Sequence, residues 1–114
     1  MTLLTLLTLL SEEPQQVSFN DVINTIAENY QYTPTSFSNG SIVNEAGTNE
    51  GSCKIFAFAK LHQLSQEQTL ACFGKYYRED VLKHPEGNDH GNIRNFMISG
   101  WNGIVFSGDA LLKT

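Results

Sequence analysis

Cys53 is the residue whose type and position best suit chemistry. It stands at the expected start of a helix, where the helix dipole lowers the pKa of a thiol and favours the reactive thiolate. Lys54 adds positive charge next to it. His90 could serve as the general base for such a nucleophile, with Asp89 or Asn95 as the group that orients the imidazole. Together these residues would make a small hydrolase.

The alternative is that the thiol is structural. Apolar Ile55, Phe56 and Phe58 follow Cys53, and burial among such side chains disfavours the thiolate. Two cysteines in a chain of this length do not form a disulfide framework, so free thiols in a reducing cytosol are expected. The sequence therefore predicts that Cys53 is buried, unreactive and not paired with Cys72.

A second group of polar residues could bind a ligand or a partner. Residues 44–54 form a polar stretch without packing residues of its own, and a helix expected after residue 88 carries basic side chains. The candidate binding residues are Asn44, Glu45, Asn49, Glu50, Lys54, His90, Arg94 and Asn95. Arg94 could clamp a carboxylate or phosphate with its fork of donors. We favour a pairing with Glu45 or Glu50 that pins the loop against the helix.

No spacing typical of a metal or cofactor site accompanies these residues. The sequence has no HExxH, CxxC, calcium-loop, phosphate-loop or dinucleotide pattern. Asp89 and His90 with Glu45 and Glu50 could ligate a metal, and the two glutamates could form an acid/base pair. Carboxylates in a polar loop are more often simply solvated, so we predict neither a metal nor a cofactor.

Charge restricts the class of partner. The net charge is −5, and no two Lys or Arg residues are adjacent. Nucleic acid and anionic membranes are poor partners for such a chain, because phosphate binding needs concentrated positive charge. A host or bacterial protein is the partner we expect, and the sequence gives no oligomeric state.

The chain is long enough for one domain. We expect it to comprise residues 17–114, preceded by a Leu-rich segment and linker over residues 1–16. The repeated Thr-Leu-Leu run is far shorter than the roughly 20 residues that span a membrane and lacks the basic start of a signal peptide. It could be a helix that packs on the domain, a frayed end or a partner-binding segment.

Hydrophobic spacing predicts about four helices in this domain. They start at a Ser18 cap, near residue 52, at a Ser65 capping box that continues to about residue 81, and at Asn88 or Asp89. In the last helix Ile93, Phe96 and Met97 should face inward, with Trp101 packed on Phe96. Strands at 41–43 and 104–106 should pair as a two-stranded antiparallel ribbon. The fold class is therefore helix-rich α+β.

The sequence resembles the HopJ type III effector family over about residues 17–111. The resemblance rests on 30–35 (YQYTPT), 37–40 (FSNG), 43–47 (VNEAG), 49–59 (NEGSCKIFAFA), 73–74 (FG), 76–78 (YYR), 84–87 (HPEG), 89–90 (DH), 92–96 (NIRNF) and 100–101 (GW). The family takes its name from virulence proteins that plant-pathogenic bacteria inject into host cells, and its relatives also resemble proteins of free-living bacteria. The resemblance supplies no reaction or catalytic residues.

Combining residues and resemblance, we predict an effector-like protein that is a non-catalytic protein–protein interaction module. Its contact surfaces would be the polar 44–54 loop and the Leu-rich start. The alternatives are a small hydrolase using Cys53 and His90, or a small-ligand-binding protein built around residues 44–54. The expected location is the bacterial cytoplasm, with delivery into a host cell by a type III system as the other possibility.

Overall fold

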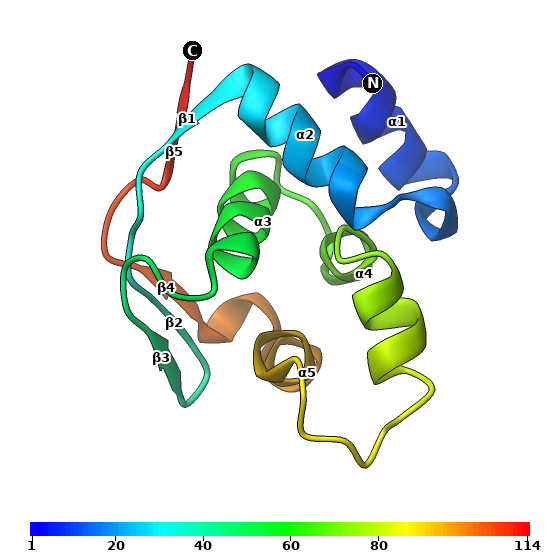
Figure 1. Cartoon of the computed structure of the whole chain (residues 1–114), viewed down its shortest axis with the longest axis vertical. Coiled ribbons are helices and arrows are strands. Elements are labelled where there is room, and N and C mark those ends of the chain that lie inside the picture. The colour runs from blue at the N-terminus through cyan, green and yellow to red at the C-terminus, as the bar shows by residue number, and fades with distance from the viewer.

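The Leu-rich start of the chain is a helix that packs on the rest of the protein. A computed structural model describes all 114 residues and places this helix, α1, at Leu3–Glu12. The Thr2 hydroxyl caps it by accepting a hydrogen bond from the Thr5 backbone N–H at 3.0 Å. Leu6 and Leu10 are fully buried, and α1 lies beside α2 (Figure 1). Of the three interpretations of this segment, the packed helix is the one observed.

Helix α2 (Phe19–Asn29) confirms the first helix predicted within the domain. The Ser18 side chain accepts a hydrogen bond from the Asp21 backbone N–H at 3.1 Å and so caps the helix. Val22 and Ile26 point into the core. A short 3-10 turn, Pro14–Gln16, joins α1 to α2.

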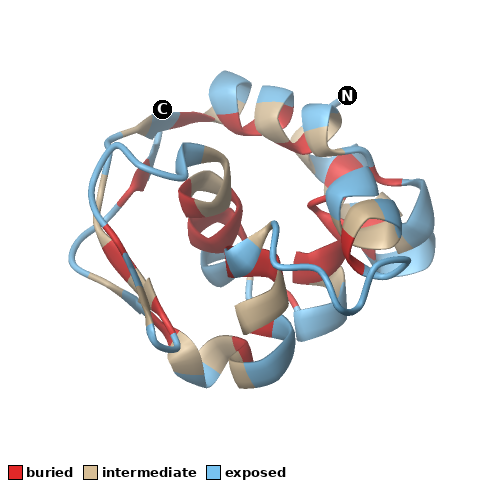
Figure 2. Cartoon of the chain, turned by 60° about the horizontal axis from the view of Figure 1, so that its bottom comes forward, coloured by how far each residue is buried: buried red, intermediate tan, exposed pale blue.

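Helix α3 (Glu50–Leu61) runs through the middle of the molecule. It provides a large share of the core, and Figure 2 shows its buried residues surrounded by the other elements. Its buried residues are Cys53, Ile55, Phe56, Ala57, Phe58 and Ala59. Residues on every side of a helix become buried when other elements surround it. The helical interpretation of residues 52–61 is confirmed.

The helix expected over residues 65–81 is divided. Helix α4 (Gln66–Ala71) has the predicted capping box: the Ser65 hydroxyl accepts from the Gln68 backbone N–H, and the Gln68 side chain accepts from the Ser65 backbone N–H. Residues 72–74 form a turn, and after Lys75 comes a π-helical segment, η2 (Tyr76–Val81).

Close approach to another helix explains the break. Gly74 has a φ of +59°, and a Cβ there would lie 2.7 Å from the backbone nitrogen of Phe19. Only glycine adopts this conformation freely and lets the two backbones approach so closely. The chain therefore turns where Gly74 meets the start of α2, and the continuous 65–81 helix was wrong.

Helix α5 (Gly91–Ser99) begins at an N-cap residue, His90, rather than at Asn88 or Asp89 as expected. A 3-10 turn, η3 (Gly100–Gly103), follows it. Trp101 packs edge-on against Phe96 with ring centroids 5.2 Å apart, which confirms that contact. Met97, expected to face inward, is exposed. The element η2 packs against α5, and its Val81 is buried.

A three-stranded antiparallel sheet lies against α5. Its strands are β2 (Phe37–Asn39), β3 (Ile42–Asn44) and β4 (Ile104–Phe106), in the order β3-β2-β4. The two predicted strands, β3 and β4, therefore belong to one sheet, but their direct pairing was wrong because β2 lies between them. A separate two-stranded sheet joins β1 (Tyr30–Tyr32) to β5 (Leu111–Lys113) near the C-terminus.

These elements confirm the α+β, helix-rich fold class. Alternation along the strands directs Phe37, Asn39 and Asn44 inward, while Val43 and Val105 face solvent. None of the helices is long and apolar enough to cross a membrane.

Candidate functional site

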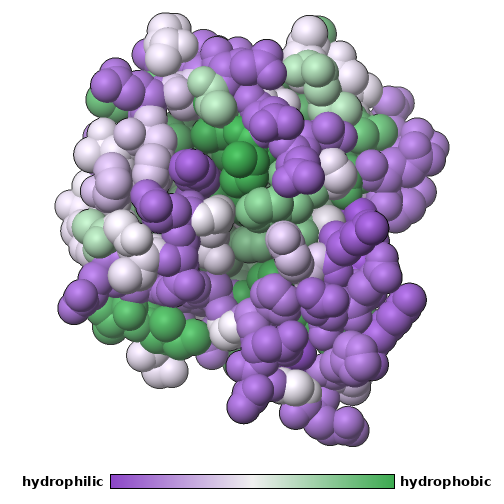
Figure 3. Space-filling view, in the orientation of Figure 1, coloured by the Kyte–Doolittle hydropathy of each residue, from purple (hydrophilic) through white to green (hydrophobic).

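A cavity of about 350 Å³ lies between the first turns of α3 and α5. Three aromatic residues and the first residues of the two helices are among those that line it. The lining residues are Phe19, Asn49, Gly51, Ser52, Phe73, Tyr76, His90, Gly91, Asn92 and Ile93. Figure 3 shows a hollow near the centre of one face of the molecule, with apolar residues in its floor and hydrophilic residues around it.

Both helices begin in the same way at this cavity. Asn49 precedes α3 and His90 precedes α5, and each has a left-handed backbone with φ near +50° and no side-chain capping bond. The first backbone N–H groups to be paired are those of Cys53, bonded to the Asn49 carbonyl, and Arg94, bonded to the His90 carbonyl. The three N–H groups before each of these have no partner within the chain. Two sets of free donors, at the positive ends of two helix dipoles, thus meet at one cavity.

Buried amides hold the two helix starts together. The Asn44 side-chain amide donates to Asn92 Oδ1 at 3.1 Å, and the Asn92 amide donates back to Asn44 Oδ1 at 2.9 Å. Asn39 donates to both the Asn92 side chain and its carbonyl, and Asn49 donates to Asn44 Oδ1 at 2.7 Å. The segment from Asn44 to Asn49, which precedes α3, is therefore fixed against the first turn of α5, and residues 50–54 of the expected polar loop belong to α3.

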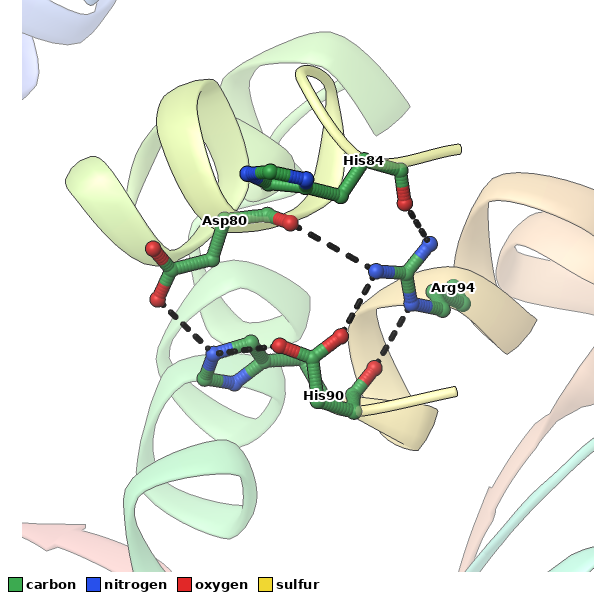
Figure 4. A network of polar contacts seen from close by, with 5 residues as sticks. Asp80, His84, His90 and Arg94 are labelled. Atoms are coloured by element: carbon green, nitrogen blue, oxygen red, sulfur yellow. Dashed lines mark hydrogen bonds and ion pairs between the residues drawn. The ribbon is translucent and has the colours of Figure 1, made fainter. Parts of the chain in front are cut away.

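His90 is paired with an acidic residue that the sequence did not single out. Its Nε2 lies 3.0 Å from Asp80 Oδ2 and 3.8 Å from Asp89 Oδ2 (Figure 4). The imidazole ring also packs on Tyr76, with centroids 5.2 Å apart. Because the Asp80 carboxylate can only accept, the His90 Nε2–H donates this hydrogen bond.

Arg94 fastens the loop that precedes α5. Its guanidinium donates to Asp89 Oδ1 at 2.7 Å, to the Asp89 carbonyl at 2.6 Å and to the His84 carbonyl at 2.9 Å (Figure 4). A longer contact of 3.5 Å reaches the Asp80 carbonyl. The hydrogen bond and the positive charge of Arg94 lower the pKa of the Asp89 carboxyl. Asp89 therefore stays ionised and the pair remains intact at neutral pH.

The expected pairing of Arg94 with Glu45 or Glu50 was wrong, because the guanidinium is occupied by the 84–89 loop. Lys54 lies over an aromatic ring instead of facing the cavity, with its Nζ 4.7 Å from the centroid of Tyr32. Asn95 donates to the carbonyl of Asn39 and so anchors α5 to the sheet. Of the candidate binding residues, Asn49 and His90 line the cavity, and Asn44 supports it from behind.

Cys53 is a buried, free thiol, as predicted. Its Sγ donates to the Thr35 carbonyl at 3.4 Å. Burial raises the thiol pKa and outweighs the nearby groups that lower it, including the positive charge of Lys54. Cys53 is not among the cavity-lining residues and makes no hydrogen bond to His90. The structure does not bring the proposed nucleophile and base together.

Sequence reasoning missed Asp80, Tyr76 and Asn92. Asp80 and Tyr76 fell within an apparently ordinary amphipathic helix, where nothing local marks a contact with residue 90. For Asn92 the sequence contained one indication of burial. It is adjacent to the apolar Ile93, and an irregular helix start can direct such a polar side chain inward. No group of three or more His, Cys, Asp and Glu residues is placed to hold a metal ion.

An apolar groove of about 380 Å³ lies on the other side of the contact between η2 and α5. We call it the Ile98 groove. It is lined by Val81, Leu82, Pro85, Gly87, Arg94, Met97 and Ile98. Leu82, Met97 and Ile98 are exposed, and Ile98 has 83% of its surface accessible.

The fold and the site define a small, helix-rich α+β domain with a polar cavity at two helix starts and a separate apolar groove. The family model for "HopJ type III effector protein" matches residues 3–111. The chain therefore belongs to the HopJ type III effector protein family, as its motifs suggested. The matched range includes α1, which the motif comparison did not.

A solved structure shares this fold. The crystal structure of VPA0580, described as a protein of unknown function, is 52% identical in sequence and superposes with a TM-score of 0.98. The alignment covers 100% of this chain and 95% of that one. No functionally curated protein matched the sequence. The family suggests secretion by a type III system, and the structural relative adds the fold without an activity.

Proposed function

We propose that this protein is a non-catalytic protein–protein interaction module, effector-like in family terms, that binds its partner through the Ile98 groove. The observation that supports the proposal most directly is the exposure of Leu82, Met97 and Ile98 around one concave surface. Single exposed apolar residues are ordinary, but apolar side chains gathered at a groove are typical of interaction sites.

The charge of the groove restricts what can bind there. Arg94 is its only charged lining residue, and its guanidinium is already paired with the Asp89 carboxylate. The groove therefore offers no free charge to a charged partner group. Met97 adds a flexible side chain that adapts to irregular apolar shapes. An apolar side chain is the group best suited to this surface.

The size of the groove favours a short segment over a second copy of the chain. Seven residues line it, whereas a stable interface uses about 20–30 residues on each side. We therefore propose that the partner presents an amphipathic helix whose apolar residues enter the groove, a recurring mode of peptide recognition. This replaces the polar loop and the Leu-rich start as the main contact surface, because the loop is bonded to α5 and α1 buries Leu6 and Leu10.

The two alternative functions fare differently. The hydrolase loses support because Cys53 is buried, has a raised pKa and lies outside the cavity that His90 lines. Small-ligand binding gains support from that cavity, whose walls combine free hydrogen-bonding groups with aromatic rings. It is a second candidate function.

Delivery into a host cell is part of the proposal and rests on the family. If the protein is delivered, its partner is a host protein. If it stays in the bacterial cytoplasm, its partner is a bacterial protein. A translocation reporter fused to the full chain distinguishes the two: a signal in host cells that requires a working type III system supports delivery, and its absence favours a partner inside the bacterium.

Site-specific photo-crosslinking tests the interaction surface. A photoreactive amino acid placed at residue 98 should crosslink one protein that is not crosslinked from residue 4. Leu4 is a matched control, since it is also exposed on a helix. The purified partner should then bind the intact protein, with at least tenfold weaker affinity for Ile98→Asp and unchanged affinity for Leu4→Asp. Crosslinking of a second copy, or equal affinity for all three proteins, would overturn the proposal.

A further inference from the structure

We infer that Met97 is an oxidation site that controls the Ile98 groove: a hydroperoxide converts its thioether to the sulfoxide, and the groove then no longer accepts an apolar side chain. This inference rests on the proposed function, because it adds a means of regulation to the same surface. It starts from the exposure and the surroundings of this one side chain.

Two of the four sulfur-containing side chains are open to a dissolved oxidant. The chain has two cysteines and two methionines. Cys53 and Cys72 are only 1% and 0% exposed, and burial raises the pKa of both thiols, so that little reactive thiolate is present. Met1 and Met97 are 50% and 37% exposed. A peroxide therefore reaches the methionines before the cysteines.

Met97 is the methionine that lines the groove, together with Leu82 and Ile98. It lies in the last turn of α5, and it belongs neither to the buried core nor to the partly buried side chains packed against that core. Met1 precedes α1 and does not line the groove. A chemical change at Met97 therefore alters the groove and leaves the core intact.

The oxidation is a two-electron step. A lone pair of the Met97 sulfur attacks one oxygen of hydrogen peroxide, the O–O bond breaks, and a sulfur–oxygen bond forms. The proton of the transferred oxygen passes to the departing hydroxide, which leaves as water. The sulfur is oxidised and the peroxide is reduced. Methionine sulfoxide reductases reverse the change: two thiols become a disulfide, and the oxygen leaves as water.

The sulfoxide changes the groove because it replaces an adaptable apolar group with a polar one. Apart from Met97 and Arg94, the lining side chains have no hydrogen-bond donor; they are Val81, Leu82, Pro85, Gly87 and Ile98. The Arg94 guanidinium is engaged by Asp89 and by the His84 carbonyl. An apolar partner side chain would therefore bury the new oxygen without a hydrogen bond, which is unfavourable.

Treatment of the full chain with hydrogen peroxide, followed by peptide mass spectrometry, tests the chemical step. Met97 and Met1 should each gain one oxygen, while Cys53 and Cys72 stay unmodified. The midpoint of urea denaturation should not change, because Met97 lies outside the core. Methionine sulfoxide reductases specific for each sulfoxide epimer, supplied with dithiothreitol, should together remove both oxygens.

Binding of Nile red, a neutral apolar dye, tests the effect on the groove. Oxidised wild type should bind the dye about five- to tenfold more weakly than untreated protein, because a polar group is buried. Met97→Gln, a polar side chain of similar length, should show the same loss without peroxide. Met97→Leu is the matched control: its Met1 is still oxidised, but its dye binding should not change. Ile98→Asp should bind weakly before and after treatment, which places the dye in the groove.

The inference is overturned if peroxide oxidises Met1 or a cysteine and spares Met97. It is equally overturned if oxidised protein binds Nile red as tightly as untreated protein, or if oxidation lowers the urea midpoint and so acts through unfolding. In these cases Ile98→Asp would still weaken dye binding, and the proposed function would stand. If Ile98→Asp binds the dye like the wild type, the groove does not accept apolar groups, and the proposed function is overturned together with this inference.

Discussion

Asn44 and Asn92 exchange two side-chain hydrogen bonds, of 3.1 and 2.9 Å, between segments that are 48 residues apart in the chain. Both side chains are almost completely buried. Each amide uses its donor and its acceptor on the other, so the pair fixes the loop before α3 to the first turn of α5. The shape of the cavity therefore depends on both residues. Asn92 lines the cavity, whereas Asn44 does not line it and supports it from behind.

Asn92→Ala should lower the free energy of unfolding by about 3 kcal/mol, because it leaves buried amide groups of Asn44 and Asn39 unsatisfied. Urea denaturation of the purified protein measures this. Asn88→Ala is the matched control, since Asn88 is exposed and lies in the loop before α5, and it should change stability by less than about 0.5 kcal/mol. Equal midpoints for the two variants would contradict the structural role of the amide pair.

Helix α2 provides a second comparison. The structure buries Ile26 fully and Ile23 only in part. Ile26→Ala should therefore lower the free energy of unfolding by about 3–4 kcal/mol, within the range for buried isoleucine, and Ile23→Ala should cost clearly less. Thermal and urea denaturation of both variants measure the difference. A larger loss for Ile23→Ala would mean that α2 is rotated about its axis relative to this structure.

Local signals predicted the parts of the fold that depend on neighbouring residues. The Ser18 cap, the Ser65 capping box and the Phe96–Trp101 contact are all set within a few residues. The break at Gly74 could not be predicted in this way, because its cause is the backbone of Phe19 on another helix. Strand β2 was missed for a related reason. Its three residues are too few to show a periodic pattern, and it is stabilised by pairing with β3 on one side and β4 on the other.

The candidate site shows the same limit. The sequence indicated that the 44–54 loop and the start of the last helix lie together, and the amide pair realises this contact. It could not give the partners of each side chain. Arg94 pairs with Asp89 five residues away, and His90 pairs with Asp80 across the 84–89 loop. These side-chain pairings depend on the path of a loop, and a loop has no periodic pattern in the sequence from which its path could be predicted.

Cys53 should alkylate slowly in the native protein at neutral pH, because burial raises its pKa and leaves little thiolate. Iodoacetamide labelling followed by mass spectrometry compares native and urea-unfolded protein, and only the unfolded form should label rapidly. Cys72 is the internal control: it is fully buried and burial raises its pKa to about 12. His90→Ala should leave the Cys53 rate unchanged. Fast native labelling of Cys53 that His90→Ala abolishes would restore the hydrolase interpretation.

His62 gives the protein a predictable response to acid. Its Nε2 lies 2.6 Å from the Tyr30 hydroxyl, and burial, followed by the charge of Lys113, lowers the pKa of the imidazole. The Tyr30 hydroxyl can donate to an unprotonated Nε2, whereas in a protonated His62 the Nε2–H donates and the Tyr30 oxygen accepts. This contact joins the end of α3 to strand β1, close to the C-terminus.

The sign of the effect follows from the two states. In the unfolded chain His62 takes up a proton near its ordinary pKa of about 6.5, whereas in the folded protein it remains neutral to lower pH. Below that value the unfolded state therefore binds more protons, and the free energy of unfolding should fall as the pH decreases. Urea denaturation at pH values between 7.5 and 5 measures the slope. His62→Gln, which cannot be protonated, should reduce the slope, while His84→Asn at an exposed position should leave it unchanged. An identical pH dependence in all three proteins would show that His62 titrates equally in both states and would contradict the lowered pKa.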